Sequence, residues 1–386
     1  MATPVGLDRL VRKEVSLGSI REIQPPQDHI GLAQIAPFLD VATDDVIFDY
    51  LKGGLQDGLA PARAEDAEAE LAQKDQLYYG EGRASIIDWA LKDKYTASDV
   101  TRYREDLLIR ERLQGTVGAG GLPTSFVGRS IDDFENRVAR DDAARRRKLD
   151  NRIEWMIMSS LENGTLAYND GKIKWTVDWG RPADQHNQVP SGGLWSLTTC
   201  DPIGDLLAAQ QLIYTRYGVT PRRGLMSTRI MNSLWKSSRF LAAVGVPVVG
   251  GTPSSTLDPN YLGLSGYTPA GALAIVEQAT GINFTIYDSV YRTRPIGSGT
   301  YTNNRFVSDD KVILWPSEAE LGEINDTSVG FAKTLTAPHP EGNWTSGYYE
   351  WEDEKKDPWM HVRGTGIKAF PVFPYMEYTF SYDVLT

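Results

Sequence analysis

The chain has 386 residues, of which 41% are hydrophobic and 24% charged, and its formal net charge is −11 at pH 7. This length predicts two or three domains, and the acidic balance argues against a dedicated nucleic-acid-binding protein, which needs a basic surface. The single cysteine, Cys200, excludes an internal disulfide framework and a cysteine-based zinc site. We see no N-terminal signal segment, and the longest apolar run, 240–249, is too short to cross a bilayer, so we expect an intracellular protein without a membrane partner.

Residues 1–45 are expected to form an arm rather than a domain. Leu7, Leu10 and Val11 give one weak apolar face beside basic residues, and Pro25-Pro26 then interrupts the chain. We expect such a segment to dock on its own chain or an adjacent one, and contact with nucleic acid is the alternative.

Residues 46–94 show the pattern of a strand, a turn-rich tip and a second strand. The tip at 61–75 is rich in Ala, Glu and Asp, and Gly80-Glu81-Gly82 leads back toward the apolar run 86–89. A long excursion with little core-forming content is uncommon inside a compact domain. It is therefore either a disordered insert or a segment that packs on another molecule.

Residues 130–163 predict one long helix. Ser130 with Asp133 resembles a capping box, Asn163-Gly164 is a helix-stop signal, and the helix would be about 50 Å long at ~1.5 Å per residue. An apolar stripe from Leu149 to Leu161 marks its second half, whereas 140–150 is nearly all charged. We expect a helix that is anchored at its ends and solvated in its middle.

The rest of the chain predicts a half-buried strand, a compact unit and a terminal strand. Ile173, Trp175, Val177 and Trp179 alternate with polar residues. Residues 196–345 read as an α/β unit, with helices opening at Asp201-Pro202, Ser227 and Thr268-Pro269 and strands at 282–287 and 311–315. Alternation from 376 to 384 predicts a final strand.

Candidate chemistry is scarce. The four histidines lack a second metal ligand at helical or turn spacing, and no nucleophile elbow occurs. Gly118-Ala119-Gly120-Gly121 lacks the Lys-Ser/Thr of a phosphate loop and reads as a flexible join. The basic run 145–148 fits a solvated or intersubunit face better than a phosphate grip. We expect no catalytic residue, no metal and no cofactor.

The order of arm, excursion, long helix, alternating strand, α/β unit and terminal strand resembles the HK97-fold major capsid proteins of tailed bacteriophages, specifically the lambda-type capsid protein E family. The most specific matches are Arg140-Asp141-Asp142, Val177-Asp178-Trp179-Gly180-Arg181 and Ser191-Gly192-Gly193-Leu194-Trp195. A second block runs from Ile282 to Asp288 and from Phe306 to Leu314. The resemblance covers residues 30–386 and implies an α+β fold.

If the resemblance holds, residues 1–45 are the N-terminal arm and 46–105 the extended loop that lies across a neighbouring subunit. The peripheral domain is 106–195 with the spine helix 130–163, the axial domain is 196–345, and 346–386 returns to the peripheral domain. The intersubunit contacts that we expect are Arg63, Glu65, Asp66, Glu68, Glu70, Trp89, Lys92, Arg140, Arg145, Arg146 and Arg147.

The implied function is a structural one. Hexamers and pentamers of the chain would form an icosahedral shell, assembled in the host cytoplasm, that encloses double-stranded DNA through weak non-specific contact. Portal and scaffolding proteins are expected partners, a decoration protein is a further one, and no covalent cross-link between subunits is expected. The alternatives are an encapsulin-like cargo compartment and, from a different class, a hydrolase or carbohydrate-binding protein.

Overall fold

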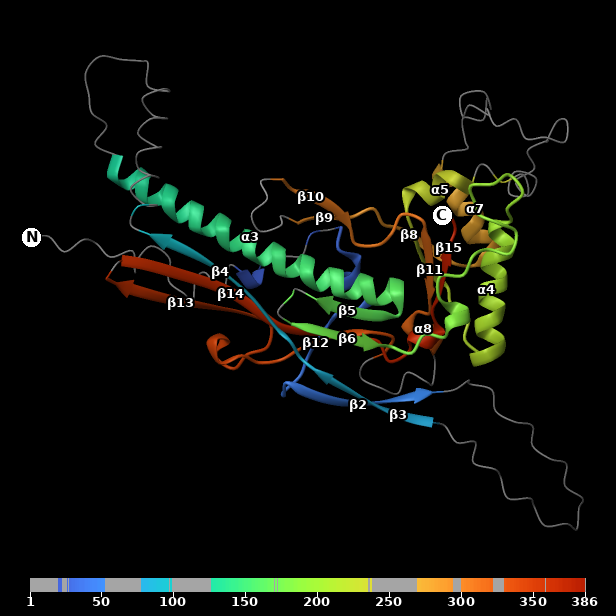
Figure 1. Ribbon diagram of the computed structural model, residues 1–386, viewed down its shortest axis with the longest axis horizontal. Helices are drawn as coiled ribbons and strands as arrows, with labels where there is room; N and C mark the ends of the chain where they lie inside the picture. Colours follow the sequence, from blue (N-terminus) through green and yellow to red (C-terminus); the bar gives the residue numbers. More distant parts are fainter. Residues whose placement is uncertain are drawn as a thin grey trace, which may run out of the picture.

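The fold combines an elongated half, built on one long helix and a sheet, with a compact half in which shorter helices lie beside a second sheet (Figure 1). This computed structural model describes residues 20–22, 26, 28–52, 78–96, 98, 126–169, 171, 173–234, 237, 269–293, 300–321, 330–357 and 359–385. Helices and strands are mixed rather than alternating along the chain, which confirms the expected α+β class.

The larger sheet has five strands that come from widely separated parts of the chain. Its order is β1-β12-β14-β13, and β4 also pairs with β14. The strands are β1 (Phe38–Asp40), β4 (Asp88–Thr96), β12 (Lys333–Thr336), β13 (Tyr348–Lys356) and β14 (Trp359–Val372). Two of them depart from the sequence analysis, which placed 88–96 in the extended loop and 333–336 in the axial unit. Strand pairing between distant segments leaves no local signal, because each strand only needs to fit a half-buried surface.

The long helix α3 (Phe126–Asn163) lies along one side of this sheet (Figure 1). Its end was predicted correctly, since Gly164 follows with a φ of 66° and so adopts the left-handed conformation that terminates helices. Its start was not: the helix begins four residues before Ser130, which is therefore no N-cap. The solvated middle was also wrong, because Asp142, Arg145 and Asp150 are buried against the sheet.

The alternating strand was predicted correctly. β6 (Lys174–Asp178) pairs antiparallel with β5 (Thr165–Asn169), and three inward side chains (Trp175, Val177 and Trp179) pack against the core. The rings of Trp179 and Phe373 lie 5.7 Å apart. Ile173 does not share this face, since it precedes β6 and is 58% exposed.

A two-stranded hairpin and part of the N-terminal segment complete the elongated half. β2 (Asp45–Lys52) pairs antiparallel with β3 (Tyr78–Ser85). The first strand was predicted, but Gly80-Glu81-Gly82, expected to lead back to a strand at 86–89, lies inside β3. The short π-helix η2 (Gly31–Ile35) packs on α3, and β1 joins the larger sheet through a parallel pairing with β12. Residues 28–40 therefore dock on their own chain, which was one of the two expectations for the arm; the apolar residues at 7–11 lie outside the described residues.

The compact half contains a four-stranded sheet in the order β15-β11-β7-β8. Its strands are β7 (Arg223–Met226), β8 (Asn283–Ile286), β11 (Lys311–Trp315) and β15 (Phe380–Asp383). The helices α4 (Pro202–Tyr217), α5 (Thr228–Ser233) and α7 (Pro269–Thr280) start where the sequence predicted. Asp201 caps α4 by accepting from the Gly204 N–H at 3.1 Å, and Ser227 caps α5 by accepting from the Ile230 N–H at 3.2 Å.

The end of the chain corrects one expectation. The final strand is shorter than predicted, because 376–378 form a 3₁₀ turn, η8 (Met376–Tyr378). Of the segment 346–386, which was expected to return to the peripheral domain, β13 and β14 belong to the larger sheet, whereas β15 pairs antiparallel with β11 in the compact half. Its residues Phe380, Ser381 and Tyr382 are all buried, so both of its faces are covered.

The remaining elements are short and connect these layers. They are η3 (Ala183–Gln185), β9 (Val290–Thr293), β10 (Thr302–Arg305), α8 (Glu318–Leu321) and η7 (Pro340–Gly342).

Candidate functional site: polar anchors of the long helix

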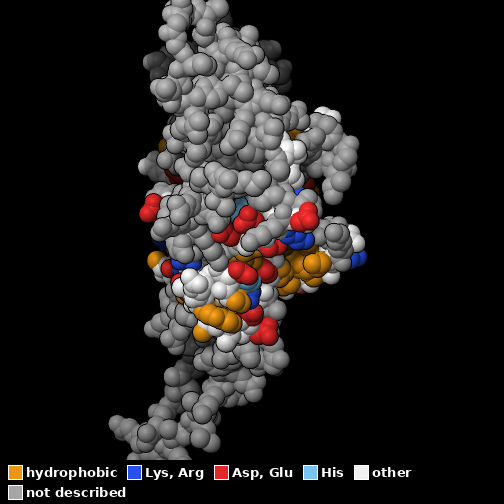
Figure 2. Space-filling view, turned by 90° about the vertical axis from the view of Figure 1, so that its left-hand side faces the viewer, with side chains coloured by type: hydrophobic (Ala, Val, Ile, Leu, Met, Phe, Trp, Pro, Cys, Tyr) orange, Lys and Arg blue, Asp and Glu red, His pale blue; other side chains and the backbone are white. Residues whose placement is uncertain are grey.

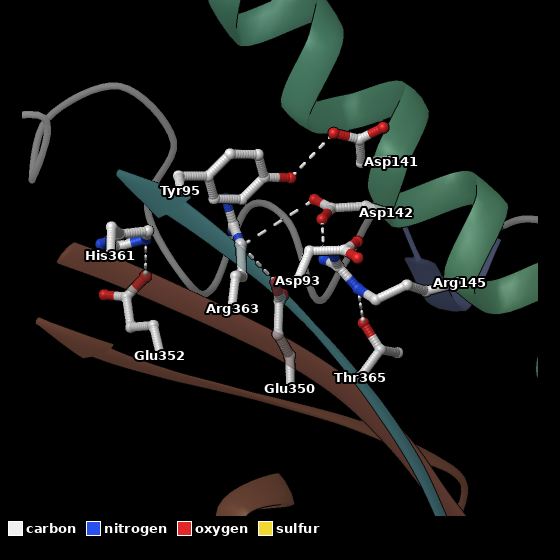
Figure 3. A network of polar contacts seen from close by, with 10 residues as sticks. All are labelled: Asp93, Tyr95, Asp141, Asp142, Arg145, Glu350, Glu352, His361, Arg363 and Thr365. Carbon is white, nitrogen blue, oxygen red and sulfur yellow. Dashed lines mark hydrogen bonds and ion pairs between the residues drawn. The ribbon is translucent and has the colours of Figure 1, made fainter. Parts of the chain in front are cut away.

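A network of buried charges joins the middle of α3 to the larger sheet (Figure 3). Arg145 is 1% exposed. Its Nη1 donates to Asp93 Oδ2 at 2.6 Å, its Nε donates to Thr365 Oγ1 at 3.1 Å, and its Nη2 donates to Asp142 one turn earlier on the helix. Because a buried guanidinium is costly unless its donors are satisfied, these partners fix the position of α3 over β4 and β14.

A second buried arginine extends this network across the sheet. Arg363 on β14 donates to Glu350 on β13, and its Nε lies 3.9 Å from Asp142 Oδ2. At the edge of the network, the Tyr95 hydroxyl donates to Asp141 Oδ2 at 2.9 Å. Burial, and then the negative charge of Asp141, raise the pKa of Tyr95, so this hydroxyl remains a donor. β4, β13 and β14 are thereby joined to α3.

Arg146, the residue after Arg145 on α3, and Asp150, one turn further along, form a second anchor. Arg146 Nε donates to Asp150 Oδ1 at 3.0 Å, and the Tyr348 hydroxyl donates to the same oxygen at 2.5 Å. The Arg146 guanidinium also lies over the Tyr348 ring, 3.0 Å from its centroid. Ion pair and cation–π contact act together here, so β13 is held against the helix.

Glu154 joins three parts of the chain at one buried carboxylate. It accepts from the Gly31 N–H at 3.0 Å, the Leu32 N–H at 3.2 Å and the Tyr287 hydroxyl at 2.8 Å. A Cβ on Gly31 would lie 2.6 Å from Glu154 Oε2, so only glycine lets the backbone approach this closely. Burial raises the pKa of Glu154 despite these donors. The N-terminal segment, the long helix and the compact half meet here.

Arg181 closes the C-terminal end of α3. Its Nη1 donates to the Glu162 carbonyl at 3.0 Å, its Nη2 donates to the Leu161 carbonyl at 2.5 Å, and its Nε donates to Thr379 Oγ1 at 2.7 Å. The last carbonyls of a helix lack intrahelical partners and carry partial negative charge. Arg181 therefore satisfies them and joins the helix end to the C-terminal segment.

These residues form structural contacts rather than a reactive constellation. Among the described residues, no group of three or more His, Cys, Asp or Glu could hold a metal ion. An open pocket of ≈ 570 Å³ lies beside Arg181 and is lined by Ser159, Asn163, Thr165, Asp178 and His186. Desolvation lowers the pKa of His186, but no nucleophile is paired with it within this lining. In the part of the chain that is described, no helix has the length and apolar character needed to cross a membrane.

Comparison with known proteins shows to which family the chain belongs. The sequence model of the family described as phage major capsid protein E matches residues 17–338. The chain belongs to this family. Its members form capsid shells, so the chain is a capsid shell protein and its place is the virion capsid. No curated protein matches the sequence.

Three solved structures are similar to this capsid protein in fold. A protein assigned as the capsid protein of a prophage from E. coli CFT073 is 15% identical, with 79% of each chain covered and a TM-score of 0.46. A phage-related protein from Bordetella bronchiseptica RB50 is 13% identical, with 96% of each chain covered and a TM-score of 0.46. The capsid of the myovirus XM1 is 11% identical, with 89% of this chain and 86% of that chain covered and a TM-score of 0.42. Family membership rests on the sequence match alone.

The structure separates the expected contact residues of this capsid protein into three groups. Lys92, Arg140 and Arg147 are exposed. Arg145 and Arg146 are buried in the subunit's own anchors, which contradicts the solvated or intersubunit face expected for them. Trp89 is half-buried, and its Nε1 donates to the Ala369 carbonyl at 3.1 Å. The remaining expected contacts lie outside the described residues: Arg63, Glu65, Asp66, Glu68 and Glu70.

Sequence reasoning missed the residues that hold the capsid subunit together. Glu154 sits among Ile153, Met156 and Ile157 on the apolar stripe of α3, and a carboxylate inside such a stripe is the signal that was available. Arg363 lies in a run of polar and apolar residues on β14 that gives no such signal. Arg181 was noted only as part of a matching motif.

Proposed function

We propose that this capsid protein assembles with copies of itself, as hexamers and pentamers, into the icosahedral head shell that encloses phage double-stranded DNA. The family match supports the shell. The role of such a subunit is structural, and we infer that it has no catalytic activity. Assembly would take place in the host cytoplasm, with portal and scaffolding proteins and a decoration protein as further partners.

The observation that carries this proposal is the hairpin β2–β3. These strands pair with each other over eight positions and with no other strand among the described ones. An isolated two-stranded hairpin is marginally stable in water. We infer that it lies against a neighbouring subunit, as the extended loop of a shell protein would, with Arg63, Glu65, Asp66, Glu68 and Glu70 near its tip as contacts.

The domain division follows the same proposal with three adjustments. Residues 1–45 are the arm, 46–105 the extended loop, 106–195 the peripheral domain, 196–345 the axial domain and 346–386 the C-terminal segment. Because β4 and β12 belong to the larger sheet and β15 to the sheet of the compact half, we assign 88–96 and 333–336 to the peripheral domain and 380–383 to the axial domain. Trp89 and Lys92 would then meet a neighbour from the peripheral domain, together with Arg140 and Arg147 on α3.

Negative-stain electron microscopy of the purified full-length chain tests the proposed function. Closed shells, tubes or ring-shaped capsomers are the expected result. A chain that stays monomeric by light scattering at every concentration would contradict it. DNA extracted from particles made during infection distinguishes a genome container from a cargo compartment.

A further inference from the structure

The middle of α3 separates its charges, with the acidic side chains turned inward and the basic ones outward. Three carboxylates occur from 137 to 152. Asp142 and Asp150 are buried beside arginines, and Asp141 accepts from the Tyr95 hydroxyl (Figure 3). The exposed side chains of the same stretch are one alanine and four cations, Arg137, Arg140, Arg147 and Lys148. A helix face that served only solubility would expose charges of both signs.

The four cations form one continuous surface, which we call the basic stripe of α3. Separations of three, seven and eleven residues return to the same side of a helix. The buried residues Asp142, Arg145 and Leu149 lie on the opposite side, so the stripe points away from the subunit's own sheet. From Arg137 to Lys148 it is about 16 Å long at ~1.5 Å per residue. Because the chain as a whole carries a net charge of −11, bulk composition does not account for it.

A neighbouring subunit is one candidate partner, but the described strands of the larger sheet gather no acidic side chains on one open face. The register with β14 places Glu352 beside Arg363, which contacts α3, so Glu352 and Glu354 lie on the side of the sheet that α3 covers. Asp353 lies on the other side, among three exposed lysines, Lys92, Lys94 and Lys355. At the end of the elongated half, Figure 2 shows acidic, basic and hydrophobic side chains next to one another.

The phosphate backbone of duplex DNA fits the stripe better than such a mixed surface. One strand presents a phosphate about every 3.4 Å along the helix axis, so a stripe of about 16 Å spans roughly five phosphates. Three of the four cations are arginines, whose planar guanidinium groups match phosphate oxygens. Among the side chains from 137 to 152, no exposed carboxylate would repel the DNA.

We infer that the basic stripe of α3 faces the enclosed double-stranded DNA and contacts its phosphates. This assignment rests on the proposed function, and for Arg140 and Arg147 it replaces a neighbouring subunit by DNA as the partner. It also orients the subunit in the shell. The side of the larger sheet along which α3 lies (Figure 1) is the inner one, and the side that carries Lys92 and Lys94 faces away from the DNA. A few phosphate contacts for each subunit are weak at physiological salt, so DNA can be both packaged and released.

Duplex binding by the unassembled full-length chain tests the contact. Fluorescence anisotropy with a short random-sequence DNA duplex is measured over a series of salt concentrations, at protein concentrations where light scattering shows no assembly. The logarithm of the affinity falls by about 0.9 per phosphate contact for each tenfold rise in salt. In the stripe variant, Arg140→Gln/Arg147→Gln/Lys148→Gln, this slope should flatten by about 2.7, and the affinity at about 0.1 M salt should fall on the order of 100-fold. Circular dichroism confirms that each variant folds.

Two controls separate the stripe from charge in general. The sheet variant, Lys92→Gln/Lys94→Gln/Lys355→Gln, removes three exposed cations from the opposite side of the sheet and changes the net charge equally; it should bind the duplex like the natural chain. Arg140→Lys/Arg147→Lys keeps both charges and should retain the natural slope.

Four results would overturn the inference: a natural chain that does not bind the duplex at low salt, a stripe variant with the natural slope, an equal loss in the sheet variant, or a lysine-for-arginine variant as weak as the stripe variant. A stripe variant that binds the duplex normally but no longer assembles also overturns it and assigns the stripe to a neighbouring subunit.

The proposed function fails separately. If the natural chain forms no oligomer at any concentration, the function falls, and with it the place of the stripe inside a shell. If shells form and the stripe variant keeps the natural slope, only the DNA contact falls.

Discussion

Glu154 shows how a single side chain holds distant parts of this subunit together. Its carboxylate is fully buried and receives three donors, two from the N-terminal segment and one from the compact half. Burial and the neighbouring carboxylate raise the pKa of Tyr287, which therefore remains a donor at this contact. Residues 31, 154 and 287 lie far apart in sequence, so this junction depends on one acceptor.

Replacing this acceptor with an amide is expected to destabilise the subunit. In Glu154→Gln, one of the two carboxylate oxygens is replaced by an amide NH₂ group, which cannot accept a hydrogen bond. The group that donated to this oxygen is then buried without an acceptor, at a cost of about 1–3 kcal/mol. Urea unfolding of the unassembled chain measures the loss. Glu352→Gln, at an exposed position, is the matched control and should change the free energy of unfolding by less than about 0.5 kcal/mol.

The same substitution predicts a pH dependence. The pKa of Glu154 in the folded state is raised above its ordinary value of 4.5, chiefly by burial. The folded state thus holds this proton more tightly, so the resulting stabilisation is complete below the unfolded pKa and is lost as pH rises through the folded pKa. The destabilisation caused by Glu154→Gln should therefore shrink as the pH is raised above 4.5. A destabilisation that grows over this range would contradict the assignment.

Trp344 is the most unusual backbone position among the described residues. It has a φ of 58°, follows Asn343 with a φ of 56°, and its side chain is 72% exposed. A bulky residue in the left-handed region costs on the order of 1–3 kcal/mol. Hydrogen bonds hold the loop in this form, including one from the Trp344 N–H to the His339 carbonyl at 3.1 Å.

Removing this strain is expected to raise stability. Trp344→Gly removes the steric cost of the left-handed conformation and little buried surface, because the side chain is exposed. The melting temperature of the unassembled chain should therefore rise. Gly347, with a φ of 98°, provides the converse control, because Gly347→Ala introduces a Cβ where the backbone disfavours one. If Trp344→Gly lowers the melting temperature as Gly347→Ala should, Trp344 packs more than its exposure indicates.

At the scale of elements, the sequence predicted best where the signal is local. The α4 helix illustrates this: Asp201 caps it, Pro202 begins it, and Gly218 ends it with a φ of 74°. The stop of α3 at Asn163 and the alternating strand β6 were predicted from equally local signals. The pairing of β4 with β14 and of β15 with β11 was not, because their partners lie more than 60 residues away. For the same reason the sequence suggested that Arg145 is a surface residue, because its partner Asp93 lies on β4, far away in sequence.

The buried middle of α3 gives a prediction at this scale. Arg145→Ala removes the nearest cation from the buried Asp142 and also removes the partner of Asp93, so it should cost about 3–5 kcal/mol. Arg147→Ala, two residues along the same helix and exposed, should cost less than about 0.5 kcal/mol. Denaturant unfolding of both variants compares them directly. Equal and small effects would mean that the charged middle of α3 is solvated after all.

At the scale of the whole molecule, α3 is bound to several other segments, whereas the β2–β3 hairpin is not paired with another strand among the described ones. Arg145, Arg146, Glu154 and Arg181 join α3 to the larger sheet, the N-terminal segment, the compact half and the C-terminal segment. The β2–β3 hairpin, by contrast, pairs only with itself among the described strands. A subunit of this kind presents a fixed body and a projecting strand pair, and the free energy of the finished shell then depends on how neighbours cover such projections.

The exposure of the lysines on β4 indicates whether subunits of a finished shell would be cross-linked covalently. A covalent isopeptide bond requires a nucleophilic lysine, and lysine becomes nucleophilic when it is desolvated. Lys92 and Lys94 on β4 are exposed, so the subunit desolvates neither of them, and we expect shells held by non-covalent contacts. Mature particles boiled in SDS should therefore run as a single monomer band on a denaturing gel. A ladder of multimers that resists boiling and reducing agent would show that a neighbour's surface desolvates a lysine. In that case Lys92→Arg and Lys94→Arg would identify it by removing the ladder.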